Sequence, residues 1–131
     1  MINPRDGGLF YWDRSGGLGA RAIEVSASGL SGTRTSVPQI AKQIIVSDSD
    51  RHIIAFGCDG LGATNAATQG SGAQDPLLIR FSSQENPVDW FPTSTNTAGD
   101  LRLGGGSTFM QAVETKQEIL VFTNKSLHSL K

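Results

Sequence analysis

Three short stretches of this 131-residue chain hold residue types suited to binding an ion or a phosphate group. The stretch SDSD (47–50) places two carboxylates two positions apart, as calcium loops do, but the glycine and the glutamate of an EF-hand are missing at their offsets. The glycine-rich stretches SGGLGAR (15–21) and LGGGST (103–108) lack the Lys-Ser or Lys-Thr that completes a phosphate-binding loop. We therefore expect turns at all three, with no bound metal and no cofactor.

The sequence gives side-chain catalysis little support. Gly70-Ser71-Gly72 lacks the Gly-x-Ser-x-Gly pattern that exposes a nucleophilic serine. His52 and His128 each lie beside apolar residues, without an acidic or cysteine partner at metal-ligand spacing, which is typical of surface or boundary histidines. Glu85 and Asp89 flank a proline turn and do not give the facing carboxylates of a glycosidase. We expect no catalytic residue and no enzyme.

Large aromatic residues are the most distinctive remaining feature. The stretch DWFP (89–92) places Trp90 and Phe91 after an expected strand, where two large rings can plug the end of a sheet. This structural interpretation is favoured over a ligand-stacking site. Trp12 and its neighbour Tyr11 offer a second aromatic position, either another plug or a platform on which a sugar ring stacks.

The elements that must position these residues are short strands. Apolar segments are four to six residues long and rich in β-branched and aromatic residues, and 16 glycines separate them, which predicts an all-β fold with antiparallel sheets. The candidate strands are 9–12, 21–25, 43–47, 52–56, 77–82, 108–113, 119–123 and 126–130. The turn-rich stretches between them are 13–20, 26–38, 57–76 and 83–100. The last two exceed ordinary hairpin loops and are expected to be surface excursions.

Two expected hairpins resemble one another. Residues 42–56 and 116–130 both run from Lys-Gln through an apolar strand and a polar turn to a second strand containing histidine, with their lysines 74 positions apart (116 minus 42). In the second hairpin, the run 119–123 suits a strand covered on both faces, and Asn124-Lys125 suits a turn. A repeat of this kind would fit about two blades of a β-propeller.

Two blades cannot close a ring, because closure needs about four. We therefore expect residues 1–131 to be a single all-β segment, a fragment of a larger propeller domain, whose apolar flanks are covered by further strands or by sister subunits. The residues expected to pack between sheets are Ile44, Val46, Ile54, Ile119 and Val121.

Composition excludes several classes of protein. Eleven basic and twelve acidic residues leave a formal charge of -1, without the basic surface of a protein that grips nucleic acid by its phosphates. Cys58 is the only cysteine, so the chain has no internal disulfide, and we expect a small buried residue there. No apolar run approaches the ~18 residues of a membrane-spanning helix.

Several stretches resemble a known family. They are YWDRSGGLGARAIEVS (11–26), VSDSDRHIIAFG (46–57), IRFSSQENPVDW (79–90), TNTAGDLRL (95–103) and AVETKQEILVFTNKSLHSL (112–130). Together they cover most of the chain and resemble virion structural proteins of tailed bacteriophages, in particular the β-propeller tail hub or nozzle proteins of short-tailed phages. None of these motifs has a catalytic meaning.

The resemblance implies a virion tail protein, made in the host cytoplasm, that forms rings with copies of itself and contacts other virion proteins. DNA would then be cargo passing through a central channel, and the near-neutral charge is compatible with a duct that does not hold phosphate. The alternative, from the residues alone, is a receptor- or glycan-binding β-domain in which Trp12, Tyr11, Trp90 and Phe91 stack on a sugar.

Overall fold

The fold is all-β and built from antiparallel sheets, as the sequence predicts. The computed structural model describes residues 1–5, 7–25, 37–38, 40–47, 51–61, 69–86, 89–90, 94–95, 97–104, 108–116 and 118–130. A short 3-10 turn, η1 (Arg14–Gly16), lies between the first two strands. The strands are β1 (Phe10–Tyr11), β2 (Ile23–Glu24), β3 (Gln43–Val46), β4 (Ile53–Phe56), β5 (Asp59–Leu61), β6 (Gln69–Gln74), β7 (Leu78–Phe81), β8 (Gly99–Arg102), β9 (Phe109–Glu114), β10 (Ile119–Thr123) and β11 (Leu127–Leu130).

The largest sheet has four strands in the order β3-β4-β7-β8, all antiparallel. All four residues of β4 are buried, so this central strand is covered on both faces. Because side chains alternate along a strand, Ile53 and Ala55 point to one face while Ile54 and Phe56 point to the other. The sheet is therefore the middle layer of the molecule.

A three-stranded sheet in the order β11-β10-β9 covers one face of the middle layer. Its buried residues include Phe109, Ile119 and Val121, which share a core cluster with Ile54 and Phe56 of β4. The rings of Phe56 and Phe109 stack at 5.1 Å between centroids, joining the two sheets at the centre of this cluster.

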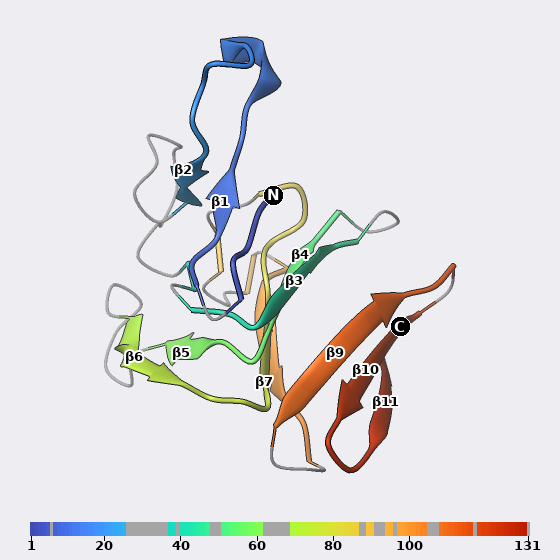
Figure 1. The fold of residues 1–131 in the computed structure, drawn as a ribbon. Helices are drawn as coiled ribbons and strands as arrows, with labels where there is room; N and C mark the ends of the chain where they lie inside the picture. Colours follow the sequence, from blue (N-terminus) through green and yellow to red (C-terminus); the bar gives the residue numbers. More distant parts are fainter. Residues whose placement is uncertain are drawn as a thin grey trace.

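The N-terminal residues cover the opposite face of the middle layer. The two-stranded sheet β1-β2 and isolated bridges from Ile2 to Phe10 and from Gly7 to Ala41 bring this segment against the four-stranded sheet. A second core cluster forms there. Its buried members are Leu9, Val25, Val37, Ala41, Ile53, Ala55, Cys58 and Trp90. Figure 1 shows the resulting arrangement, with the N-terminal hairpin and the β9-β10-β11 sheet on opposite sides of β3 and β4.

One side chain ties the two main sheets together along their adjoining edges. Gln43 of β3 donates from Nε2 to the carbonyl oxygen of Ala112 at 2.9 Å, and its Oε1 accepts the N–H of Ala112 at 3.0 Å. The side-chain amide thus reproduces the pair of hydrogen bonds that a neighbouring strand would make to β9. Lys42 adds a bond from Nζ to the Thr108 hydroxyl at 3.0 Å. The edge of β9 is therefore bound to β3 through side chains.

Two of the expected loops contain residues that form strands. Residues 57–76 contain the hairpin of β5 and β6, and residues 83–100 include the start of β8. Glycine and small polar residues fill β6 (QGSGAQ) and weaken its strand signal, so backbone pairing with β5 defines it where side-chain pattern does not. Most of the expected loop 26–38 lies outside the described residues.

The two hairpins that resemble each other in sequence do not occupy equivalent places. β3-β4 joins the edge strand of the four-stranded sheet to an interior strand, whereas β10-β11 joins the middle strand of the three-stranded sheet to its edge. The second hairpin turns at Asn124-Lys125 as predicted, since the N–H of Thr123 binds the Ser126 carbonyl at 2.9 Å across these two residues. The Thr123 hydroxyl accepts the N–H groups of Lys125 and Ser126 at 3.3 and 2.9 Å, so the residue before the expected turn organises it.

Candidate functional site

The outer face of the three-stranded sheet carries several exposed apolar side chains on neighbouring strands. The register pairs Leu120 with Val113 and Phe122 with Leu127, which places these four side chains on the face opposite the core. Phe122 is 39% exposed, Val113 44% and Leu127 56%, and Leu120 is half-buried. We call these four residues the outer face. Strand β10 is thus covered on one face only, which corrects the prediction of a strand covered on both.

Contiguous exposed apolar patches on soluble proteins mark contact surfaces when they are large. Both faces of the middle sheet are covered by other layers of this chain. The outer face belongs to one of these covering layers and lies on the side that points away from the middle sheet. Its four apolar residues suit packing against another sheet, while Gln111 and Ser129 lie on the same face by register and the Ser129 hydroxyl donates to the Glu118 carboxylate. The outer face is therefore suited to a second sheet.

The residues predicted to pack between sheets mostly lie in the cores. Ile54, Ile119 and Val121 belong to the cluster between the two main sheets, and Ile44 is partly buried against the N-terminal cluster. Val46 is the exception, since 44% of it is exposed at the end of β3. Its assignment to inter-sheet packing is wrong because the covering N-terminal layer does not extend to that end of the strand.

Of the two predicted plugs, Trp90 is fully buried and Phe91 lies outside the described residues. Trp90 belongs to the N-terminal cluster, and the guanidinium carbon of Arg80 lies 5.9 Å from the centre of its ring. A fully buried ring cannot stack on a sugar, so Trp90 is excluded from the glycan alternative. Trp12 is 40% exposed, donates its indole N–H to the Ala20 carbonyl at 3.0 Å, and follows the half-buried Tyr11.

Beside Trp90 the structure buries charged groups that sequence reasoning did not single out. Arg80 is 1% exposed and Asp59 is 0% exposed. Arg80 donates from Nη1 to the Asp59 carbonyl oxygen at 3.1 Å, and the Asp59 carboxylate accepts the N–H of Ile40 at 3.1 Å. The sequence feature that indicates this cluster is the arginine inside an otherwise apolar strand, Leu-Ile-Arg-Phe.

Burial dominates the electrostatics of this cluster. Burial lowers the pKa of the Arg80 guanidinium below its ordinary value, and the neighbouring Cys58, Asp59 and Asp100 partly offset that effect. Burying a cation is tolerated when an anion and hydrogen-bond acceptors accompany it. Arg80 and Asp59 are therefore buried charges that interact electrostatically at the junction of β5 and β7, and Arg80 also donates a hydrogen bond to the Asp59 backbone carbonyl.

Cys58 is buried beside this pair, as expected. Burial raises the pKa of its thiol to about 12 from an ordinary value of 9.0. The folded state keeps the thiol proton up to that pH, whereas the unfolded chain loses it from about pH 9 upward. Burial of the thiol should therefore leave stability unchanged below pH 9 and reduce it progressively between pH 9 and 12.

This prediction is checked by urea unfolding of the wild-type chain and the Cys58→Ala variant across that alkaline range. The gap between their free energies of unfolding should narrow as the pH rises, because only the wild-type chain loses stability through the thiol. Contributions from the other side chains are common to both proteins and cancel in the comparison. A gap that stays constant would show that the thiol is not protected.

The two histidines lie in or beside strands, His128 within β11 and His52 directly before β4. His128 is half-buried, and its Nε2 lies 2.9 Å from the Ser126 hydroxyl. That hydroxyl also lies 2.9 Å from the Thr123 hydroxyl, so it belongs to the hydrogen-bond network of the β10-β11 turn. A serine and histidine in contact resemble part of a catalytic triad, but no carboxylate orients this imidazole among the contacts of the described residues. The contact between Ser126 and His128 therefore belongs to the β10-β11 turn.

His52 lies at the start of β4, with its Nδ1 2.7 Å from the Ser82 carbonyl oxygen and its ring edge-on to Phe81. Of the expected calcium-like stretch, residues 48–50 lie outside the described part, and Ser47 and His52 close the hairpin through a backbone bond of 2.8 Å.

No group of His, Cys, Asp or Glu side chains within the described ranges is arranged to hold a metal ion. Across those same ranges, the structure contains no helix with the length and apolarity needed to span a bilayer.

Comparisons with known proteins add no relative to this picture: no family model, no curated protein and no solved structure matches the chain.

Proposed function

We propose that this chain is a structural component of a phage virion tail, of the hub or nozzle type, which acts by assembling around the channel through which DNA leaves. The family is suggested by sequence resemblance alone. The observation that carries the assembly part is the outer face: a sheet packed on one side like a core and left apolar on the other. Such a surface is stabilised by covering it, and no chemistry is assigned to it.

The layered packing supports the same proposal. Three layers already stack face to face in this chain, and a propeller is a stack of this kind closed into a ring. When two different surfaces of one chain bind each other, each copy can bind the next one. The resulting array closes into a ring if the angle between layers allows it. In this proposal the outer face packs against a further sheet, supplied by copies of this chain or by neighbouring virion proteins.

The proposal is tested by sedimentation velocity and native mass spectrometry over a range of protein concentrations. We expect oligomers that grow with concentration, and we expect Phe122→Glu to shift the population to monomer, because a carboxylate would be buried against an apolar surface. Val46→Glu is the matched control, since Val46 is exposed to a similar degree and lies on the other sheet. A wild-type chain that stays monomeric throughout, or equal effects of both variants, would contradict the assembly proposal. Detection of this chain in purified phage particles tests its place in the virion.

The glycan-binding alternative retains one supporting observation, the exposed ring of Trp12 next to Tyr11. Its measurable consequence is quenching or shift of tryptophan fluorescence on adding saccharides, lost in Trp12→Ala. Because Trp90 is buried and cannot respond directly, a signal in this assay would report Trp12.

A further inference from the structure

The two main sheets differ in size, and the difference leaves a hollow between their free edges. The middle sheet has four strands and the sheet packed on it has three. Strands β3 and β9 adjoin at one side through Gln43, while β8 and β11 end the two sheets as unpaired edge strands of the described residues. The three-stranded sheet therefore covers the middle sheet incompletely toward β8.

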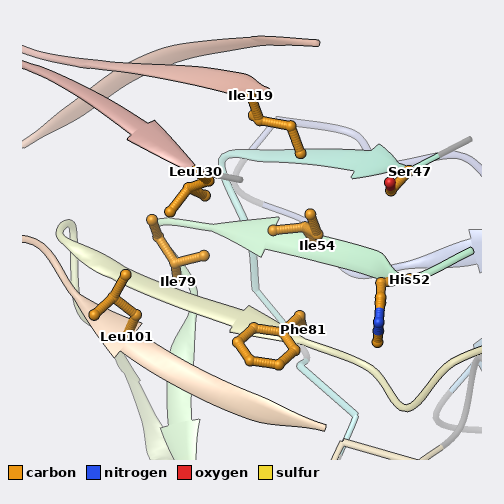
Figure 2. A pocket seen from close by; sticks show the side chains of 8 residues that line it. All are labelled: Ser47, His52, Ile54, Ile79, Phe81, Leu101, Ile119 and Leu130. Atoms are coloured by element: carbon orange, nitrogen blue, oxygen red, sulfur yellow. The ribbon is translucent and has the colours of Figure 1, made fainter. Parts of the chain in front are cut away.

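A pocket of about 230 Å³ lies in this place. Figure 2 shows its apolar side chains pointing toward one another, with His52 and Ser47 at one end. The apolar lining consists of Ile54, Ile79, Phe81, Leu101, Ile119 and Leu130. Both edge strands contribute to it, β8 through Leu101 and β11 through Leu130. Leu101 is 48% exposed, so the pocket is open to solvent beside the free edges.

The pocket is shaped in part by a glycine. Gly99 of β8 lies opposite Phe81 of β7, and the aromatic ring rests on it so closely that a Cβ at residue 99 would be 2.6 Å from the ring carbon Cζ. Because a Cβ at residue 99 would displace this ring, the glycine allows Phe81 to line the pocket in its present position.

The outer edge of β11 presents hydrogen-bonding groups beside this pocket. Thr123 N–H binds the carbonyl of Ser126, and the register then directs the backbone groups of His128 and Leu130 toward β10. By the alternation of an antiparallel ladder, the N–H and C=O groups of Leu127 and Ser129 point outward. Within the described residues, no backbone bond occupies them.

We propose that β11 and this pocket together form a strand-addition site for an extended polypeptide segment of a partner. The segment adds a fourth strand beside β11 through the backbone groups of Leu127 and Ser129, and its inward side chains are large and apolar at alternate positions. One such side chain enters the pocket between Phe81 and Leu101. Backbone bonds supply affinity in this mode of recognition, and the pocket supplies selectivity for the side chain.

The occupant follows from the shape and chemistry of the site. The volume is suited to one large side chain, and the lining offers only apolar groups apart from His52 and Ser47 at one end. An added strand would give the second sheet the same number of strands as the first and cover the exposed half of Leu101. The inference goes beyond the proposed assembly through the outer face, because it concerns the edge and the inner face of the same sheet.

The test uses the full chain and a fluorescent peptide, acetyl-Lys-Thr-Ile-Thr-Leu-Thr-Ile-Lys-amide, at protein concentrations where sedimentation shows no self-association. Binding is followed by fluorescence anisotropy, and the site by backbone amide NMR. We expect saturable binding, with the largest shifts and new amide protection at Leu127 and Ser129. A peptide whose central leucine is replaced by aspartate should bind at least about tenfold more weakly.

Two variants locate the site independently. Ser129→Pro removes an outward N–H and should weaken binding at least about tenfold, since proline is tolerated on the solvent side of an edge strand but cannot donate. Leu101→Lys places a charge in the pocket and should have a similar effect, whereas Met110→Lys, at a residue 49% exposed outside the pocket, should have none. If Ser129→Pro unfolds the chain, peptide binding by Leu101→Lys alone tests the location of the site.

No saturable binding, or shifts confined to β3 or to the outer face, would overturn the strand-addition site. Equal binding by wild type and Leu101→Lys would do the same. These outcomes are separate from failure of the assembly proposal, which Phe122→Glu tests on the opposite face of the sheet with no peptide present.

Discussion

Replacing Trp90 with alanine is expected to lower the free energy of unfolding by about 3 to 5 kcal/mol. The side chain is fully buried in the cluster between the N-terminal layer and the middle sheet, so its removal leaves a large cavity bordered by residues from both. It also removes the aromatic face on which the Arg80 guanidinium rests. The loss should appear as a lower midpoint in urea unfolding monitored by circular dichroism.

The matched control is Trp12→Ala, because Trp12 is 40% exposed and outside both core clusters. Its loss should cost less than about 1 kcal/mol, as for most surface substitutions. A loss below about 1 kcal/mol for Trp90→Ala would contradict its burial. Trp90→Phe, which retains most of the apolar volume, should fall between the two.

Replacing Arg80 with methionine should destabilise the fold by about 3 to 5 kcal/mol. Methionine preserves much of the apolar stem of the side chain, so the effect isolates the guanidinium. Without it, the carboxylate of Asp59 remains buried beside an apolar residue, and the Asp59 carbonyl loses its side-chain donor. Equilibrium unfolding in urea measures the loss.

A double-mutant cycle with Asp59→Asn separates the charge pair from packing. We expect the double variant to be more stable than the sum of the single effects predicts, because removing both charges leaves no uncompensated ion. Arg102→Met is the control for arginine itself, since its ion pair with Asp75 lies at the surface, and it should cost less than about 1 kcal/mol. Strict additivity in the Asp59 and Arg80 cycle would show that the two groups do not interact.

The sequence predicts the fold class and eight of the strands, because apolar alternation and β-branched residues mark the segments that pack in the cores. It misses β5, β6 and β8, whose sequences DGL, QGSGAQ and GDLR contain glycine and polar residues typical of turns. Pairing with neighbouring strands defines these elements, and that information is nonlocal. The extent of the N-terminal layer, which decides the exposure of Val46, is nonlocal for the same reason.

The candidate sites were less predictable than the strands. The run 119–123 is apolar at successive positions, and this pattern does not distinguish a strand buried on both faces from one that shows Phe122 and Leu120 to a partner. In the sequence, Gln43 belongs to a repeated Lys-Gln pair at the start of an expected strand, and nothing there indicates that its amide reaches a residue 69 positions away. Arg80 lies in a quoted motif, but its burial depends on Asp59, which sits in a stretch expected to be a loop.

The Gln43 amide has a consequence for the geometry of larger arrays. Together with the Lys42–Thr108 bond it links β3 to β9 at one margin, while mostly apolar residues border a hollow at the opposite margin between β8 and β11. Two sheets that are linked at one margin and separated by a hollow at the other form a wedge. Wedge-shaped units that stack face to face turn in a constant direction. The length of the side chain at residue 43 therefore contributes to the curvature, and hence to the circumference, of any closed array built from such layers.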